Sequence, residues 1–285
     1  MPSYLIGVGG DLHTVLLRTS GTELEGEPVN MVNQIDATSL WDGGDIVFGR
    51  RRPMATRYAL NARFSREDGD DVPMGHVLRP HWRGRVHVLA LAVIAPAVLV
   101  LVASADGTVG TRVGVAVYAA GLCSMLFVSA TYHRWVHGLR ARSAWRRADH
   151  ATIFAAIAGS ATPIVRWALP GVAGWLLLGT VWAAAAIGAG CKLGRWWRGD
   201  QVGTVMYGIT IVLAALAVPA LWQRHGPGPA GLVIVGATVY LVGAMCFALR
   251  WPVLRPTVFS FHEVWHLFTV VAAGLQLVAI WMLAT

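Results

Sequence analysis

Charged residues are scarce in this sequence. Only 13% of the 285 residues are Asp, Glu, Lys or Arg, whereas 55% are hydrophobic and the mean hydropathy is +0.55. A soluble domain carries about 25% charged residues and needs them to cover its surface. The composition therefore excludes a soluble globular enzyme. It also excludes a disordered chain, which requires low hydrophobicity and high net charge.

Cysteine is scarce as well. The chain has three cysteines, Cys123, Cys191 and Cys246, which are far apart and form no CxxC pair. They exclude a disulfide scaffold. Their hydrophobic surroundings indicate small apolar packing residues.

Acidic residues become rare after position 78. Residues 1–78 hold 11 of the 15 acidic and 7 of the 23 basic residues, which leaves 4 acidic and 16 basic residues for residues 79–285. Basic clusters between long apolar runs are typical of the cytoplasmic side of a membrane protein. The high net charge of +8 therefore indicates a membrane protein and no nucleic-acid partner.

The chain is predicted to have two parts, residues 1–78 and residues 79–285. The first part has neither a membrane-length apolar run nor the charged and apolar regions of a signal peptide. Tyr4–Val8 is compatible with a strand, but no sustained period follows. We expect a cytoplasmic extension that is disordered or weakly structured. Met74 is an alternative start of the chain, close to the membrane part.

Residues 79–285 contain seven apolar segments, each near the ~20 residues that a helix needs to cross a bilayer. They are residues 86–105, 113–133, 149–167, 171–191, 203–222, 230–249 and 262–283. The predicted fold is all-α and integral to the membrane, a seven-transmembrane helix bundle. The predicted kinks at Pro96, Pro163 and Pro219 are interpreted as packing features.

The loops predict the orientation. Lys and Arg number 13 on the side of the N-terminus and 3 on the other side. Because basic loops stay in the cytoplasm, we expect a cell-membrane protein with a cytoplasmic N-terminus and an outside C-terminus. The basic side comprises Arg79, Arg83, Arg85, Arg134, Arg140, Arg142, Arg146, Arg147, Lys192, Arg195, Arg198, Arg250 and Arg255. The other side has Arg112, Arg166 and Arg224.

Polar residues of separate segments converge at the cytoplasmic depth. Ser129 and His133 are four residues apart at the end of segment two, and His262 and His266 are four apart at the start of segment seven. Each pair therefore shares one helix face. Asp149 begins segment three. Ionisable groups in a membrane normally face the bundle interior and mark function.

Three imidazoles and a carboxylate suit a Zn²⁺ site. We expect His133, His262 and His266 to be the ligands, with a water in the fourth position. Asp149 would hydrogen-bond and deprotonate that water, and Ser129 would orient a ligand or substrate carbonyl. The alternative for Asp149 is a simple N-cap of the third helix.

A second pattern, HExxH, is present in His262–Glu263–Val264–Trp265–His266. In metalloproteases the Glu is the base and the third ligand lies downstream, but no His, Cys, Asp or Glu follows His266. Glu263 is about 100° of helix away from the His face, so we expect Glu263→Gln to keep both metal and activity. His87 is interpreted as a weaker candidate for a direct role.

The combined pattern resembles the hemolysin III family, the bacterial branch of the progestin and adipoQ receptor superfamily that includes the adiponectin receptors. The residues that carry the resemblance are Ser129-x3-His133 with Tyr132, Arg147-x-Asp149-His150, His262-x3-His266 and Arg83-Gly84-x-x-His87. It covers roughly residues 79–285. It implies a seven-helix bundle with cytoplasmic-side Zn²⁺ held by the three histidines, with Asp149 on the water and Ser129 nearby.

Four functions remain open on the sequence. The first is zinc-dependent hydrolysis of a lipid amide or ester. Related eukaryotic branches include ceramidases, so the resemblance implies a ceramide-like amide as substrate and a link to membrane lipid homeostasis. The second is a regulatory or receptor-like protein with structural zinc and a membrane lipid as ligand. The third is a cytolysin, as the family name suggests, although the segments lack a repeated polar stripe. The fourth is a transporter, but no inverted repeat is apparent.

Overall fold

The computed structural model describes residues 3–8, 11–16, 80–136, 139–194, 200–255 and 258–285. It divides into two units, Met1–Arg63 and Phe64–Thr285. In the first unit, β1 (Ser3–Val8) pairs antiparallel with β2 (Asp11–Leu16), and the register joins Ser3 to Leu16. The run Tyr4–Val8 is therefore part of a strand. The expectation for residues 17–79 falls outside the described residues.

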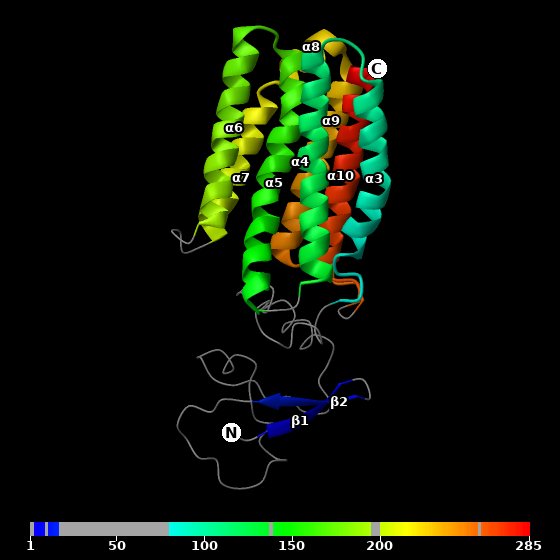
Figure 1. Cartoon of the computed structure of the whole chain (residues 1–285), viewed down its shortest axis with the longest axis vertical. Coiled ribbons are helices and arrows are strands. Elements are labelled where there is room, and N and C mark those ends of the chain that lie inside the picture. Colours follow the sequence, from blue (N-terminus) through cyan, green and yellow to red (C-terminus); the bar gives the residue numbers. More distant parts are fainter. Residues whose placement is uncertain (1–2, 9–10, 17–79, 137–138, 195–199, 256–257) are drawn as a thin grey trace. The chain divides into compact units, whose positions relative to one another are not determined.

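The second unit is a bundle of long helices that run in alternating directions (Figure 1). Its described part contains seven helical segments that are long and apolar enough to cross a membrane, which confirms the predicted seven-transmembrane bundle. The helices are α3 (Arg85–Ser104), α4 (Val109–Arg134), α5 (Leu139–Ala168), α6 (Val172–Leu193), α7 (Asp200–Ala215), α8 (Val218–His225), α9 (Pro227–Leu249) and α10 (Phe261–Ala284).

The third segment begins ten residues earlier than predicted. Its apolar part starts near residue 149, but α5 starts at Leu139. Arginine is a good helix former, so the helix continues beyond the apolar stretch, and Arg147 reaches back to the Ser143 hydroxyl at 2.8 Å. The assignment of the four arginines of this region to a loop was therefore wrong: Arg140, Arg142, Arg146 and Arg147 lie on α5.

The fifth segment was predicted as one helix over residues 203–222. The structure instead has α7 and α8, separated at Leu216 and Ala217. Pro219 lies in the first turn of α8. Proline lacks the N–H for a helical hydrogen bond and clashes with the preceding turn, so a helix is interrupted just before it. Pro96 and Pro163 remain inside α3 and α5.

Small residues bring α4 and α5 close together. A Cβ added at Gly121 of α4 would lie 2.5 Å from the Ala155 carbonyl oxygen, and one added at Gly159 of α5 would lie 3.1 Å from the Val117 carbonyl oxygen. Close backbone approach over glycine is a common way for helices to associate in membranes. This contact fixes the spacing of the two helices that carry His133 and Asp149.

The bundle has two chemically different ends. The first, which we call the histidine end, is where α4 ends and α3, α5 and α10 begin; the C-terminus lies at the opposite end (Figure 1). The described basic residues of the predicted cytoplasmic side all lie at the histidine end, whereas Arg112, Arg166 and Arg224 lie at the opposite end. Which end faces the cytoplasm stays a prediction.

Candidate metal centre

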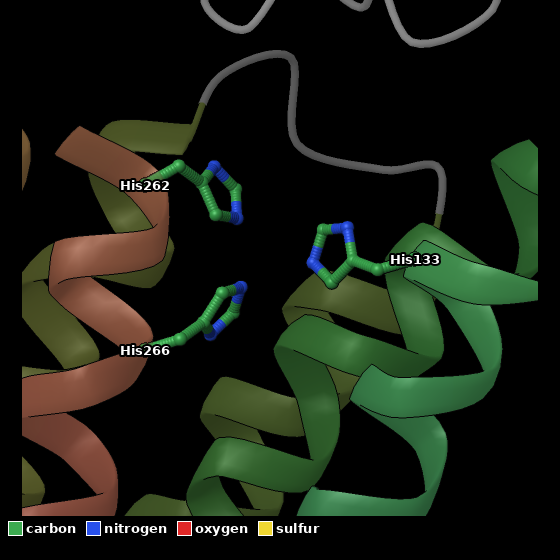
Figure 2. Close-up of side chains that lie close together, drawn as sticks. All are labelled: His133, His262 and His266. Carbon is green, nitrogen blue, oxygen red and sulfur yellow. The ribbon is translucent and has the colours of Figure 1, made fainter. Parts of the chain in front are cut away.

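Three histidines from two helices meet at the histidine end (Figure 2). His133 is in the last turn of α4, and His262 and His266 are on the first two turns of α10. Each offers one ring nitrogen, and these three atoms lie within 4.8 Å of one another. The ring centroids of His133 are 4.9 Å from His262 and 5.0 Å from His266. The predicted convergence of these residues is present in the structure.

The cluster is shielded and fits a metal ion. His133 and His266 are each only 4% exposed. Both ring nitrogens of His266 are buried and have no hydrogen-bond partner among the described residues. An unsatisfied buried polar group costs about 1–3 kcal/mol, and a metal ion would remove that cost at one nitrogen. Three neutral imidazoles with a free fourth position are typical of catalytic zinc sites, and imidazole also suits copper, iron and nickel.

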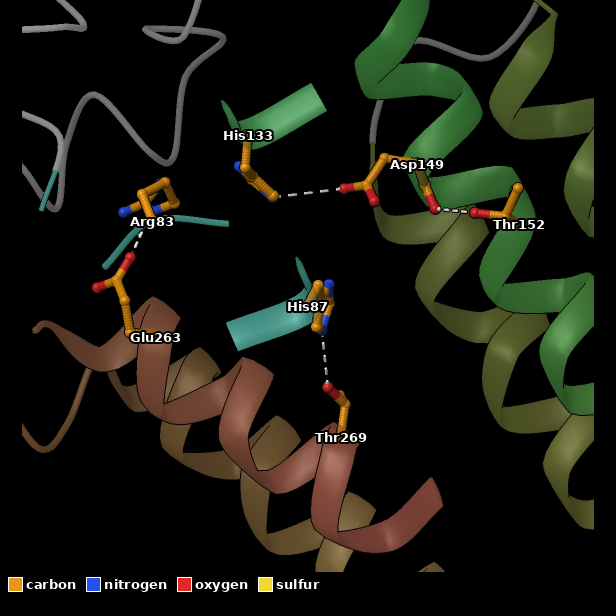
Figure 3. Close-up of polar contacts among 7 residues, drawn as sticks. All are labelled: Arg83, His87, His133, Asp149, Thr152, Glu263 and Thr269. Atoms are coloured by element: carbon orange, nitrogen blue, oxygen red, sulfur yellow. Dashed lines mark hydrogen bonds and ion pairs between the residues drawn. The ribbon is translucent and has the colours of Figure 1, made fainter. Parts of the chain in front are cut away.

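Asp149 lies beside the cluster. It is 8% exposed, and its Oδ2 atom is 3.7 Å from Nε2 of His133 (Figure 3). It lies ten residues inside α5, where Thr152 donates to its backbone carbonyl at 2.9 Å. The N-cap alternative for Asp149 was therefore wrong, because the helix begins at Leu139. A carboxylate placed in mid-helix next to His133 is explained better by the cluster than by helix capping.

Ser129 is buried on α4, one turn before His133, with 2% of its surface exposed. Its position on the same helix face as His133 agrees with the spacing of the two residues. Its proposed contact with a substrate carbonyl stays a prediction.

Glu263 is fully buried and takes no part in the cluster. One carboxylate oxygen forms an ion pair with Nε of Arg83 (Figure 3). The other accepts from the Ser260 backbone N–H at 2.7 Å. Glu263 thus caps the start of α10 and neutralises a buried arginine. The HExxH pattern is therefore explained by local structure. Because Glu263→Gln would leave the Arg83 charge buried and unpaired, we no longer expect this substitution to be silent.

The turn before α3 connects the helices that carry the histidines. Helices α4 and α10 contact each other sparsely, whereas each packs along α3. The Trp82 backbone N–H donates to Val258 O at 3.1 Å, close to the start of α10. Gly84 has φ +77°, and a Cβ there would lie 2.9 Å from the Cβ of His133. Together with the Arg83 ion pair, this turn sets the gap between His133 and the α10 histidines.

His87 is the residue that sequence reasoning undervalued. It is 2% exposed on α3, and its ring centroid is 4.1 Å from that of His266. Its Nε2 atom is 3.3 Å from the Thr269 hydroxyl (Figure 3). The available signal was the motif Arg83-Gly84-x-x-His87 at the start of the first membrane segment. The sequence did not reveal that α3 and α10 are neighbours.

The membrane part of the chain is similar to known proteins. The family described as "Haemolysin-III related" matches residues 76–277. "Hemolysin-3" of Bacillus cereus is 29% identical over 184 residues, which are 64% of this chain and 81% of that protein. "Hemolysin-3 homolog" of Bacillus subtilis (strain 168) is 26% identical over 144 residues, which are 50% of this chain and 65% of that protein.

The family match confirms the resemblance that the sequence motifs indicated. It begins at residue 76, close to the predicted boundary near residue 79, and it includes His133, Asp149 and both histidines of α10. With seven membrane-length helices in the described part of the chain, this protein is a multi-pass membrane protein of the haemolysin-III-related family.

Proposed function

We propose that this protein is a zinc-dependent hydrolase that cleaves an amide or ester bond of a membrane lipid. The observation that carries the proposal is the meeting of three imidazole nitrogens within 4.8 Å, with a carboxylate beside them. Such a set holds a metal by three protein ligands and leaves a fourth position for water or substrate. The family resemblance links this activity to membrane lipid homeostasis.

The roles follow from the positions of the side chains. His133, His262 and His266 would hold the ion, and Asp149 would accept a proton at its carboxylate. Ser129 would orient the substrate carbonyl. When bound, Zn²⁺ lowers the pKa of a coordinated water toward ~7 and polarises a carbonyl. In the reaction, water adds its hydroxyl to the acyl carbon, and its proton goes to the departing amine or alcohol.

The substrate is proposed to be a lipid because of where the cluster lies. The histidines are on the last turn of α4 and the first two turns of α10, and both helices are long and apolar enough to cross the membrane. A lipid in the adjacent leaflet would present its polar linkage at that depth. With the basic end in the cytoplasm, the N-terminus is cytoplasmic, the C-terminus is outside, and the site serves the inner leaflet of the cell membrane. A reporter fused to the C-terminus that is active only in the cytoplasm would contradict this orientation.

Two alternatives are supported by particular observations. A regulatory or receptor-like protein with structural zinc is favoured by the imidazole of His87 against His266, because a protein group near the cluster would help to close it. Lysis of membranes is favoured by the name Hemolysin-3 of the two Bacillus relatives. In the first alternative a membrane lipid would be a ligand, and in both the lipid would stay intact.

The experiment is metal and product analysis of the full chain. The protein is purified in detergent, its metal content is measured, and it is reconstituted in vesicles of bacterial phospholipid supplemented with a ceramide. Lipid products are analysed before chelation, after chelation and after return of zinc. We expect one zinc per chain and release of fatty acid that chelation abolishes and zinc restores. Bound zinc without any product would favour the regulatory alternative, and leakage of vesicles without product would favour lysis.

A further inference from the structure

The Thr269 hydroxyl selects one tautomer of neutral His87. This hydroxyl donates to the His266 backbone oxygen at 2.8 Å. It also lies 3.3 Å from Nε2 of His87 (Figure 3). A hydroxyl has one proton. Because that proton is used on the carbonyl, the hydroxyl accepts from His87, and Nε2 carries the hydrogen. The Nδ1 atom of neutral His87 is then a hydrogen-bond acceptor.

The ring of His266 needs such an acceptor. His87 Nδ1 and both ring nitrogens of His266 are buried and have no partner among the described residues, although the two rings are in contact at 4.1 Å. A histidine that binds a metal through one nitrogen carries a proton on the other, and that N–H almost always donates to a fixed acceptor. The other two imidazoles beside His266, those of His133 and His262, are themselves candidate ligands.

We propose that His87, held by Thr269, is a positioning residue of the metal centre. Its Nδ1 accepts from the His266 N–H that the metal does not use, and so fixes the tautomer and ring orientation of His266. The contact of His87 with Thr269 and the hydrogen bond from Thr269 to the His266 carbonyl are present in the structure. The hydrogen bond from His266 to His87 is the proposed link, which would form when His266 binds the metal. This inference rests on the metal site of the proposed function, but not on hydrolysis.

The test measures metal binding by the full-length protein in detergent. Zn²⁺ affinity is obtained by competition with a chelator, and Co²⁺ is used as a spectroscopic probe of ligand geometry. His87→Phe keeps a ring of similar shape but removes the acceptor. We expect it to bind Zn²⁺ about 10–100-fold more weakly, the usual effect of losing such a partner, and to change the Co²⁺ absorption bands.

Thr269 provides an independent variant pair. Thr269→Val keeps the shape and removes the hydroxyl, so we expect a smaller loss of affinity in the same direction; Thr269→Ser restores the hydroxyl and should approach the wild type. The matched controls are Thr238→Val, whose hydroxyl bonds only to the Ile234 carbonyl of α9, and His225→Phe at the opposite end. Both controls should bind metal as the wild type does.

The outcomes separate this inference from the proposed function. Unchanged Zn²⁺ affinity and Co²⁺ bands in His87→Phe would overturn the role of His87 while leaving the metal site in place. If His87→Phe does not fold, Thr269→Val with wild-type affinity, or Thr269→Ser as weak as Thr269→Val, would overturn it. A wild type that binds no Zn²⁺ or Co²⁺ would overturn both proposals. Metal binding without lipid hydrolysis would overturn only the enzymatic one.

Discussion

The two ends of the bundle differ in the kinds of polar side chain that they bury. In the described part of the chain, every buried arginine, histidine, aspartate and glutamate lies at the histidine end; the set is Arg83, His87, His133, Arg142, Asp149, Glu263 and His266. Farther along the bundle, the buried serine and threonine hydroxyls donate within their own helices. Ser160 donates to the Ala156 carbonyl at 2.8 Å, and Thr162 donates to the Ala158 carbonyl at 2.7 Å.

This difference indicates where the protein keeps side chains whose burial costs free energy. A hydroxyl that bonds to the preceding turn of its helix costs little in a membrane. A buried charge or imidazole costs several kcal/mol unless it is paired or binds a metal. The opposite end keeps its charges at the surface, where Arg166 stacks 4.2 Å above the Trp175 ring. The concentration of buried charged and imidazole side chains at the histidine end is therefore expected for a functional site.

The largest expected effect of a substitution at the histidine end is on the rate of lipid hydrolysis. If Asp149 is the base, Asp149→Asn should lower lipid hydrolysis by ~10²–10⁴-fold, the usual contribution of a positioned base, while zinc content changes little. Product formation and metal content are measured on the same preparation. Turnover equal to that of the wild type would remove Asp149 from the mechanism.

The next effect is on stability. Arg83→Met or Glu263→Gln alone leaves one buried charge without its partner, which typically costs about 3–5 kcal/mol. The double variant Arg83→Met with Glu263→Gln removes both charges and should be less destabilised than either single variant. Thermal unfolding in detergent measures the three. A double variant that loses as much as the two single variants combined would show that the ion pair is not the coupled unit described here.

A smaller effect is expected at Gly84. Gly84→Ala places a Cβ 2.9 Å from His133 at φ +77°, so it should both strain the backbone and weaken zinc binding. Gly171 is the matched control, because it has φ +76° and nothing within 4 Å of an added Cβ. Gly84→Ala should lose about 1–2 kcal/mol from the left-handed backbone. Gly171→Ala, at ψ −156°, should lose about 1–3 kcal/mol from its own strained backbone. Equal zinc affinity in the two would show that the turn before α3 does not position His133.

The smallest effect on stability and function is expected for a substitution away from the histidine end. Ser160→Ala removes a hydroxyl that bonds only within α5, so its loss should cost about 1 kcal/mol or less. Zinc affinity and lipid turnover should remain those of the wild type. A strong loss of either would break the comparison, because it would place functional polar chemistry outside the histidine end.

The sequence predicted the bundle and the three-histidine cluster for identifiable reasons. Long apolar runs and short loops define seven alternating helices, so residues at the same depth of different helices can be recognised without knowing which helices touch. The spacing of four residues places His262 and His266 on one face. The extension of α5 back to Leu139 was missed, because apolar content marks the part of a helix in the membrane and not its ends. Pro219 was interpreted as a packing kink, whereas the helix is interrupted just before it.

The supporting contacts were not predictable in this way. The Arg83–Glu263 pair, the approach of Gly84 to His133 and the contact of His87 with His266 all depend on α3 lying beside α4 and α10. Hydropathy does not specify the neighbours of a helix. A single sequence therefore indicates which residues share a depth, whereas the structure adds which of them touch.

The central claim is that the three histidines hold one metal ion, and metal content tests it most directly. Zinc per chain is measured in the purified wild type, in His133→Ala, His262→Ala and His266→Ala, and in the control His225→Ala at the opposite end. We expect about one zinc in the wild type and the control, and loss of most of it in each of the three variants, because two imidazoles alone hold zinc poorly. Stoichiometric zinc in all three variants, or none in the wild type, would contradict the claim.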